Sequence, residues 1–263
     1  MTESSLPMDD TNKPNAARIY DYLLGGSHNF AADQAAGERI AQIFPSIRHG
    51  SKLNRWFMYA IVQDLAKGNF NCYIDLATGL PTEGYLHELV PSSCKILYND
   101  QDPITVAYGE DIIKSHKNVT YKQSRIQDID AILEAAEKHF GGERCVAICF
   151  VGVAYFLNDE EVKRVTDRLY EWCAPGSRLA TSWLQLNADH PRIQELKALY
   201  EQLRSPAYGR TPEEVKQLLS PWHIDEPGLL PLNEWVVPDL TVPWYDADDA
   251  GMAQPFGCIA TKL

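Results

Sequence analysis

The amino-acid sequence predicts an α/β fold with a doubly wound, mostly parallel sheet, and three observations lead to it. Short apolar runs that read as strands alternate with helical segments, which is typical of parallel strands joined by helical crossovers. The first quarter of the chain reads as helical. A proline-rich tail ends in the strand-like run Phe256–Thr261, which we expect to pair antiparallel at the sheet edge. The parallel strands are predicted at Cys72–Asp75, Lys95–Asn99, Val119–Lys122, Cys145–Val151 and Arg178–Trp183.

Changes in periodicity predict the domain organisation. Residues 1–13 are polar and acidic, and we expect a disordered tail there. From 14 to 68 the pattern is helical but broken at Gly25-Gly26 and at Pro45, which predicts two or three helices that form a lid packed on the core. Residues 69–263 then form the core that binds the ligand. No internal repeat or low-complexity linker divides the 263 residues, so one compact domain is the simplest count.

The clearest predicted helix follows Asn158. Asn158 can cap its first turn, with Glu161 placed as the reciprocal capping partner. One apolar face then repeats at helical spacing, and Ala174-Pro175-Gly176 ends the helix. The residues of that face are Val162, Val165, Leu169 and Trp172.

The most informative stretch is the end of the first predicted strand. An apolar run stops at Asp75, and small residues at Ala77 and Gly79 let the backbone approach a ligand closely. Pro81 suits the first turn of a following helix, which would place Thr82 beside the ligand. This strand–turn–helix pattern is typical of a Rossmann-like sheet that binds a nucleotide. On its own it could equally be an ordinary connection between a strand and a helix.

A second acidic residue lies at the distance that favours the ligand interpretation. The next strand ends in Asn99-Asp100-Gln101-Asp102, and Asp100 comes 21 residues after Gly79 (100 − 79). A carboxylate at that spacing can accept hydrogen bonds from both ribose hydroxyls. We therefore assign Asp100 to the ribose, with Gln101 beside it and Asp102 as the next candidate.

The same stretch argues against a ligand with phosphates. The third glycine of G-x-G-x-x-G is missing, and Leu80-Pro81 occupies the place where a pyrophosphate needs free N–H groups. No G-K-[ST] sequence occurs either. An adenosine ligand without phosphates fits better, and S-adenosylmethionine is the common one.

The fourth predicted strand is apolar along its whole length, which indicates a central position buried on both faces. The loop after it must then lie at the ligand crevice, where Gly152 allows a close backbone approach and Tyr155 presents a ring face or a hydroxyl. Tyr155 could also merely cap the core, and packing is the better interpretation of Phe156.

The N-terminal helical segment carries an unusual number of aromatic residues. Tyr20 and Tyr22 precede the double glycine, and ring faces attract a sulfonium cation by about 0.5–2 kcal/mol each. We therefore interpret this segment as a lid over the sulfonium, with Tyr20 and Tyr22 as candidate catalytic residues; Arg55 and its neighbours could support the lid or only pack beneath it. Ordinary amphipathic packing through Ile19, Tyr22 and Leu23 explains part of the same pattern.

Composition excludes several classes of function. A formal net charge of −12 and a pI near 5.0 argue against nucleic acid or an anionic membrane surface as a partner. No apolar run reaches the roughly 20 residues that span a bilayer, and the polar N-terminus lacks a signal-peptide core, so we expect a cytoplasmic protein. Neither the six cysteines nor the seven histidines form metal-binding pairs, so no metal is predicted.

Several motifs together resemble the S-adenosyl methyltransferase family common in actinobacteria. The run P-x-x-A-R-I-Y-D-Y-L-L-G-G-x-x-N-F-A-A-D spans Pro14–Asp33, and D-L-A-T-G-L-P-T spans Asp75–Thr82. Shorter matches are N-R at Asn54-Arg55, D-Q-D-P at Asp100–Pro103, A-P-G-S at Ala174–Ser177 and E-P-G-L at Glu226–Leu229. The resemblance covers nearly the whole chain and implies a Rossmann-like sheet that binds S-adenosylmethionine under an N-terminal lid. It further implies that the following residues contact the cofactor: Gly26, Asn29, Phe30, Arg55, Arg125 and Ile126.

Three positions depart from the family pattern. Ala77 replaces the usual glycine, Arg125 replaces an aspartate suited to the adenine amino group, and Tyr155 replaces a histidine. If that histidine acts as a general base in the family, this chain lacks it.

The leading hypothesis is an enzyme that uses S-adenosylmethionine to methylate a small molecule of secondary metabolism. A second hypothesis is cyclisation of S-adenosylmethionine to azetidine-2-carboxylate with release of methylthioadenosine, which needs no acceptor. A third is a binding module without catalysis. The products formed from S-adenosylmethionine alone distinguish the three.

Overall fold

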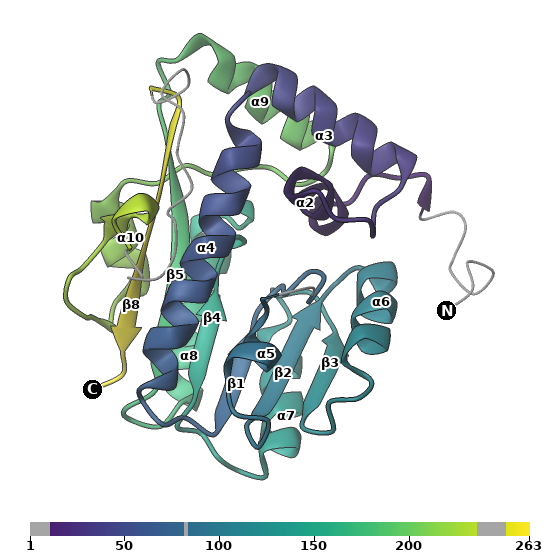
Figure 1. Cartoon of the computed structure of the whole chain (residues 1–263). Coiled ribbons are helices and arrows are strands. Elements are labelled where there is room, and N and C mark those ends of the chain that lie inside the picture. Colours follow the sequence, from purple (N-terminus) through teal and green to yellow (C-terminus); the bar gives the residue numbers. More distant parts are fainter. Residues whose placement is uncertain (1–10, 82–83, 236–250) are drawn as a thin grey trace.

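The computed structural model describes residues 11–81, 84–235 and 251–263, and these form an α/β fold around one sheet (Figure 1). The strand order is β3-β2-β1-β4-β5-β8-β6, with β7 paired to β8. The first five strands run parallel, and β8 runs antiparallel to β5 and pairs with its whole length. The strands are β1 (Cys72–Asp75), β2 (Lys95–Asp100), β3 (Val119–Gln123), β4 (Ala147–Phe150), β5 (Arg178–Leu186), β6 (His223–Ile224), β7 (Leu230–Pro231) and β8 (Ala253–Thr261).

The predicted fold class and the position of each long strand are confirmed, with shifted boundaries. β4 is shorter than expected, and β5 and β8 are each three residues longer because they pair with each other as a ribbon past the end of their neighbours. The predicted C-terminal strand is antiparallel but is not outermost, since the two-residue strands β6 and β7 pair along its other side.

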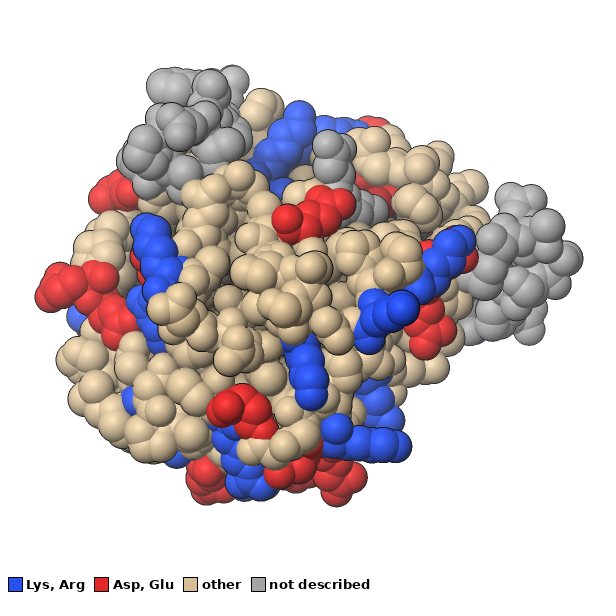
Figure 2. Space-filling view, turned by 60° about the horizontal axis from the view of Figure 1, so that its bottom comes forward, with Lys and Arg blue, Asp and Glu red and all other residues tan. Residues whose placement is uncertain are grey.

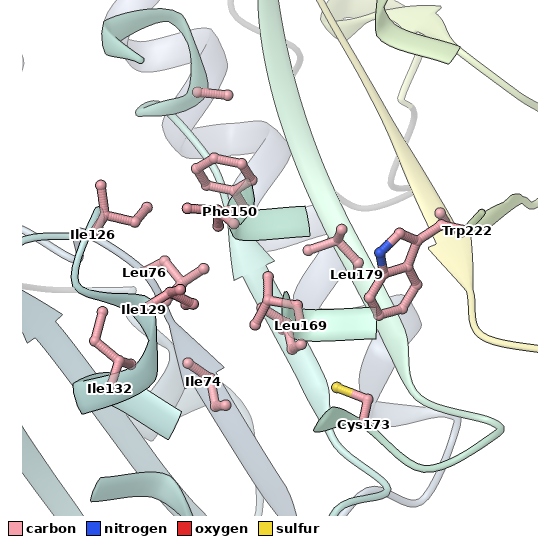
Figure 3. Packing of buried hydrophobic residues seen from close by; sticks show 14 of the residues in the cluster. Ile74, Leu76, Ile126, Ile129, Ile132, Phe150, Leu169, Cys173, Leu179 and Trp222 are labelled. Carbon is pink, nitrogen blue, oxygen red and sulfur yellow. The ribbon is translucent and has the colours of Figure 1, made fainter. Parts of the chain in front are cut away.

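Helices cover both faces of the sheet, as expected for a doubly wound fold. On one face lie α7 (Ile129–Phe140), α8 (Asp159–Trp172) and α10 (Pro212–Leu219), whose side chains share a core with Ile74 and Phe150 (Figure 3). On the other face α4 (Ile47–Ala66), α5 (Leu86–Leu89) and α6 (Pro103–Ile113) share a core with Tyr73 and Tyr98. Ile74 and Tyr73 are adjacent in β1 and enter opposite cores, as the two-residue period of a strand requires.

The cap predicted for α8 is confirmed. The Asn158 side chain accepts a hydrogen bond from Glu161 N at 2.9 Å, and the Glu161 carboxylate accepts one from Asn158 N at 3.0 Å. The predicted apolar face is buried, and the helix ends at Trp172.

Three helices form the N-terminal block. α2 (Ala16–Leu24) ends at Gly25, whose φ of 87° needs glycine, and α3 (Ala31–Ile43) follows. Both pack with α9 (Pro191–Gln202) in a third core above the sheet, where Figure 1 shows α3 and α9 side by side over α2. α4 instead packs on the sheet, in one core with Tyr73, so a lid boundary at residue 68 would cut through a shared core.

The helix predicted to open at Pro81 is wrong. Pro81 lies in non-helical backbone, and the next helix, α5, has only four residues and begins at Leu86. The segment stays close to the β1 turn because Tyr85 Oη donates a hydrogen bond to Thr78 O at 2.6 Å. Thr82, which we assigned to the ligand, lies outside the described residues, as does most of the tail expected at 1–13.

On the face that Figure 2 shows, acidic and basic side chains are interspersed and neither sign forms a continuous stripe. In the described part of the chain, no helix is long and apolar enough to cross a membrane. Over the same residues, no cluster of three or more His, Cys, Asp and Glu side chains is arranged to hold a metal ion.

Candidate functional site

A cavity of about 490 Å³ lies at the carboxyl ends of β1, β2 and β4, with α2, α4 and α9 around it. Its strand end is lined by Asp75, Ala77, Gly79, Asp100, Gln101 and Gly152. Its helix end is lined by Tyr20, Tyr155, Phe156, Trp183, Leu196, Lys197, Tyr200, Leu203 and Arg204. Such a crevice is where ligands bind in open α/β sheets.

The turn after β1 is held by hydrogen bonds to the end of β2. Ala77 N donates to Asn99 Oδ1 at 3.0 Å, and Gly79 N donates to Asp100 Oδ2 at 3.1 Å. Both Ala77 (φ 50°) and Gly79 (φ 66°) adopt left-handed backbone, which explains why glycine suits position 77 and why alanine there is strained. A Cβ at position 79 would lie 3.7 Å from Ala17 Cβ, so α2 lies against this turn.

Two buried carboxylates face the strand end. Burial raises the pKa of Asp75 to about 7, with a further contribution from nearby Asp100, while Thr78 and Arg55 oppose the shift. Burial raises the pKa of Asp100 to about 6, although the main-chain N–H groups of Asp102 and Gly79 donate to it and oppose the shift. Each carboxylate would be stabilised by further hydrogen-bond donors from a ligand.

Arg55 extends from α4 into the same cavity. Its guanidinium lies 4.2 Å from the centroid of the Tyr85 ring and 6.0 Å from that of Tyr20. The positive charge is near enough to Asp75 to favour its ionised form. A cation in this place can bind a ligand carboxylate.

A chain of hydrogen bonds fixes Tyr20 between the strand end and the helix end. Gly152 N donates to Ser182 Oγ at 2.9 Å, and Ser182 Oγ donates to Asn54 Oδ1 at 2.8 Å. Asn54 Nδ2 donates to Tyr20 Oη at 3.3 Å, and Tyr20 Oη donates to Ser51 O at 2.9 Å. A Cβ at position 152 would come within 2.8 Å of Asn54 Nδ2, so this series of hydrogen bonds requires glycine at position 152.

Tyr155 lies on the short 3₁₀ helix η2 (Ala154–Phe156), beyond β4. Its ring packs edge-on against Phe156, with 4.7 Å between ring centroids, and Phe156 in turn packs against Tyr200 at 5.9 Å. Burial raises the pKa of Tyr155 well above its usual value, and the hydroxyls of Tyr20 and Tyr200 add to this. Phe156 therefore both packs and lines the cavity.

The structure brings most of the predicted site residues to the cavity. Those that line it are Tyr20, Arg55, Asp75, Ala77, Gly79, Asp100, Gln101, Arg125, Ile126, Gly152 and Tyr155. The Arg125 side chain is exposed and, with five donors and no acceptor, cannot accept a hydrogen bond from an amino group.

Tyr22 does not line the cavity. Its hydroxyl donates to Glu38, the Arg48 guanidinium lies 5.5 Å from its ring centroid, and a Cβ on Gly37 would meet its ring at 2.6 Å. Two residues along a helix are about 200° apart, so Tyr20 and Tyr22 cannot both face one cavity. The prediction that placed them together is corrected on that ground.

Asp102 does not line the cavity and instead binds Arg18 of α2. Its carboxylate accepts two hydrogen bonds from Arg18 Nη1, at 2.9 and 3.1 Å, and caps α6 by accepting from Thr105 N. Arg18 is 1% exposed and also donates to Asp33 at 2.9 Å. This ion-pair group joins α2, α3 and the end of β2, and Asp102 N donates to Asp100 at 2.9 Å.

Gly26, Asn29 and Phe30 also lie outside the cavity lining and shape the connection between α2 and α3. Asn29 Nδ2 donates to Asp21 Oδ2 at 2.8 Å, and a Cβ on Gly26 would overlap the same carboxylate at 2.1 Å. The Phe30 ring lies 5.5 Å from the Arg18 guanidinium. These positions support the lid through packing and turn geometry.

Sequence reasoning missed several residues of this site. Ser182 and Ser51 take part in the Tyr20 chain, and Lys197 and Tyr200 lie on α9, more than 40 residues from the nearest predicted site residue. No local pattern marks Lys197 and Tyr200, because their place follows only from the packing of α9 on α3.

A model of the S-adenosyl methyltransferase family matches residues 3–262. The chain belongs to this family. The cofactor of this methyltransferase family is S-adenosylmethionine.

Solved structures agree with the family. A protein from Thermobifida fusca YX described as a candidate methyltransferase shares 26% identity at a TM-score of 0.87, with 99% of each chain covered. A DUF574 family protein from Streptomyces avermitilis MA-4680 shares 27% identity at a TM-score of 0.85, covering 97% of this chain and 99% of that one. A geranyl diphosphate methyltransferase solved with S-adenosylmethionine is 13% identical over 83% of this chain and 90% of that one, at a TM-score of 0.52, and shares the fold alone. No curated protein matches the chain.

Proposed function

We propose that this protein transfers the methyl group of S-adenosylmethionine to a small molecule, in a reaction of secondary metabolism. The observation that carries the proposal is one continuous cavity that joins a strand end with buried carboxylates to a helix end of aromatic and aliphatic side chains. The first suits the adenosine and amino-acid parts of the cofactor, and the second suits an apolar acceptor.

The strand end fits S-adenosylmethionine by the chemistry of its side chains. Asp100 would accept hydrogen bonds from the ribose hydroxyls, and Asp75 would pair with the ammonium group of the methionine part. Arg55, on the same wall, would bind the carboxylate. Ala77, Gly79 and Gln101 would lie along the nucleoside, with Arg125 and Ile126 beside the adenine.

The ring of Tyr20 lies between the two ends, and Tyr155 lies beyond Gly152. Both rings would face the sulfonium and shield it from water. When bound, S-adenosylmethionine supplies a methyl carbon activated by the positive sulfur. The residues of this chain need only align the acceptor with that carbon and exclude water, which are large contributions to such reactions.

Cyclisation of S-adenosylmethionine is a second candidate because of one specific observation. No histidine lines the cavity within the described residues, and burial raises the pKa values of Tyr20, Tyr155 and Tyr200, so none of these hydroxyls is a base near neutral pH. A reaction in which the cofactor's own amine displaces the sulfur would need no acceptor and only a neutral amine.

Mass spectrometry of the products separates the candidates. With S-adenosylmethionine and a pool of small molecules, methyl transfer yields S-adenosylhomocysteine in an amount equal to the methylated product. With S-adenosylmethionine alone, cyclisation yields methylthioadenosine. If neither product forms although calorimetry detects binding, the protein is a binding module and methyl transfer is refuted.

A further inference from the structure

α9 supplies two polar side chains at the helix end of the cavity. Lys197 and Tyr200 lie on α9 three residues apart and therefore on one side of it, and Arg204 follows two residues beyond its end, in left-handed backbone with a φ of 56°. Leu196 and Leu203, beside them in sequence, line the cavity too. The wall is therefore apolar with a row of positive and hydroxyl groups.

The two cations of this row have no acidic partner. Within the described residues, neither the Lys197 ammonium nor the Arg204 guanidinium forms an ion pair or a side-chain hydrogen bond, whereas the nearby Arg210 is paired with Asp159 at 2.8 Å. Both cations line the cavity of a chain with net charge −12, the Lys197 side chain half-buried and the Arg204 side chain exposed. Their charge raises the local concentration of anions.

Two acids of the lining already accept hydrogen bonds from other groups. The Glu161 carboxylate accepts hydrogen bonds from Asn158 N and Gln127 Nε2, and the Asp21 carboxylate accepts from His28 N and Asn29 Nδ2. Neither compensates Lys197 or Arg204.

Two tyrosine hydroxyls at this end are unpartnered donors. Across the described residues, no protein group forms a hydrogen bond with Tyr155 Oη or Tyr200 Oη, and both side chains line the cavity. Burial raises the pKa of Tyr200 to about 12, so the hydroxyl keeps its proton. Both groups can donate to an oxygen atom of a bound molecule.

We infer that the methyl acceptor has an apolar body and an oxygen that is ionised at neutral pH, a carboxylate or an acidic phenol, recognised by Lys197, Arg204, Tyr155 and Tyr200. This inference rests on the proposed methyl transfer. The oxygen's electron pair forms the new C–O bond as the C–S bond breaks, so an anion and a sulfonium become two neutral molecules and no proton has to be removed. An acceptor of this class needs neither a tyrosine nor a histidine as general base.

The test uses a matched pair of aromatic probes with the full chain. Binding of 2-naphthoate and of the neutral 2-naphthamide is measured by calorimetry in the presence of saturating S-adenosylhomocysteine. We expect the anion to bind at least tenfold more tightly than the amide. Lys197→Gln should weaken binding of the anion about fivefold and leave the amide unchanged, and Tyr200→Phe should weaken it two- to fivefold.

Lys138→Gln, on the exposed side of α7 and away from the cavity, is the matched control and should bind both probes as the parent does. Equal binding of the two probes, tighter binding of the amide, or no binding of the anion overturns the inference. Binding of S-adenosylhomocysteine tests the proposed function separately. If this product does not bind, the proposal of methyl transfer is wrong. If it binds but 2-naphthoate binds no more tightly than 2-naphthamide, only the acceptor class is wrong.

Discussion

At its strand end the cavity is framed by main-chain groups and two carboxylates that follow neighbouring strands, whereas its helix end is framed by side chains from segments far apart in sequence. Gly79 N and Ala77 N, in the turn after β1, donate hydrogen bonds to Asp100 and Asn99 at the end of β2, and Thr78 Oγ1 donates to Asp75 O within the turn. Tyr20, Tyr155 and Tyr200 come from α2, η2 and α9 and meet only in the folded chain. The proposed cofactor site thus depends largely on local sequence, and the proposed acceptor site depends on tertiary packing.

The largest effect should come from the ion-pair group that joins these two regions. Arg18→Met removes the cation between the buried carboxylates of Asp33 and Asp102. Unpairing a buried ion costs about 3–5 kcal/mol, so we expect the free energy of unfolding to fall by about that amount in chemical denaturation. Because Asp102 N also donates to Asp100, affinity for S-adenosylmethionine should fall as well.

Arg48→Met gives the control for this change. Arg48 is also an arginine of the N-terminal helices paired with an acid, Glu38, but the two side chains are 37% and 52% exposed, so stability and affinity should change far less. If Arg18→Met were as stable as Arg48→Met, the strand end and the lid would be independent units.

Asp100 should have the next largest effect, confined to the strand end. Asp100→Asn keeps the shape and removes the charge, and Asp100→Ala also leaves two ribose hydroxyls without an acceptor, at about 1–3 kcal/mol. We expect at least a tenfold loss of affinity for S-adenosylmethionine with alanine and a smaller loss with asparagine, measured by calorimetry. Binding of 2-naphthoate should survive in both variants.

Asp189→Asn is the control for the Asp100 variants. It changes an exposed carboxyl before α9 and should bind S-adenosylmethionine as tightly as the parent does. Unchanged affinity in Asp100→Ala would overturn the ribose assignment, and Asp102 could not replace it, since Asp102 is paired with Arg18.

The same contrast explains which parts of the molecule could be predicted from sequence. The β1 turn and the Asn158 cap are each encoded within a few residues, and Asp100 is marked by its spacing of 21 residues from Gly79 (100 − 79); the structure has all three. The helix after Pro81 was not predictable from the proline alone, because a contact of Tyr85 with Thr78 keeps that segment at the turn. No local sequence pattern marks Lys197 and Tyr200 on α9 as residues of the cavity.

The sequence itself contained information against two of the predicted site residues, Tyr22 and Asp102. The 200° between Tyr20 and Tyr22 on a helix rules out a shared cavity for both. Asp102 stands directly before Pro103 at the start of a helix, where an aspartate commonly caps the backbone, and it does cap α6.

A smaller effect is expected from pH at the strand end. The folded pKa of Asp75 is raised to about 7, above its usual value of about 3.8, so the folded ligand-free protein holds this proton more tightly than the unfolded chain. Stability should therefore fall as pH rises from about 4 to about 7. Affinity for S-adenosylmethionine should rise several-fold over pH 6 to 8, because the ionised carboxylate pairs with its ammonium group.

Asp75→Asn should flatten both pH profiles in thermal unfolding and in calorimetry. If Asp75→Asn kept the parent's pH dependence of binding, another group would control that dependence, and Asp100 would be the first candidate.

The smallest change should be Tyr155→Phe, which tests the helix end alone. The ring keeps its packing against Phe156 and its face toward the reacting centre, and only the unpartnered hydroxyl is lost. A donor to an anionic acceptor contributes mainly to binding, so KM for an acceptor such as 2-naphthoate should rise two- to fivefold while kcat stays within about twofold. Tyr155→Ala removes the ring as well and should lose most of kcat, because water then reaches the sulfonium. A large fall in kcat in Tyr155→Phe would instead assign proton transfer to this hydroxyl, although burial holds its pKa well above the usual value. Full activity in both variants would make Tyr155 a packing residue.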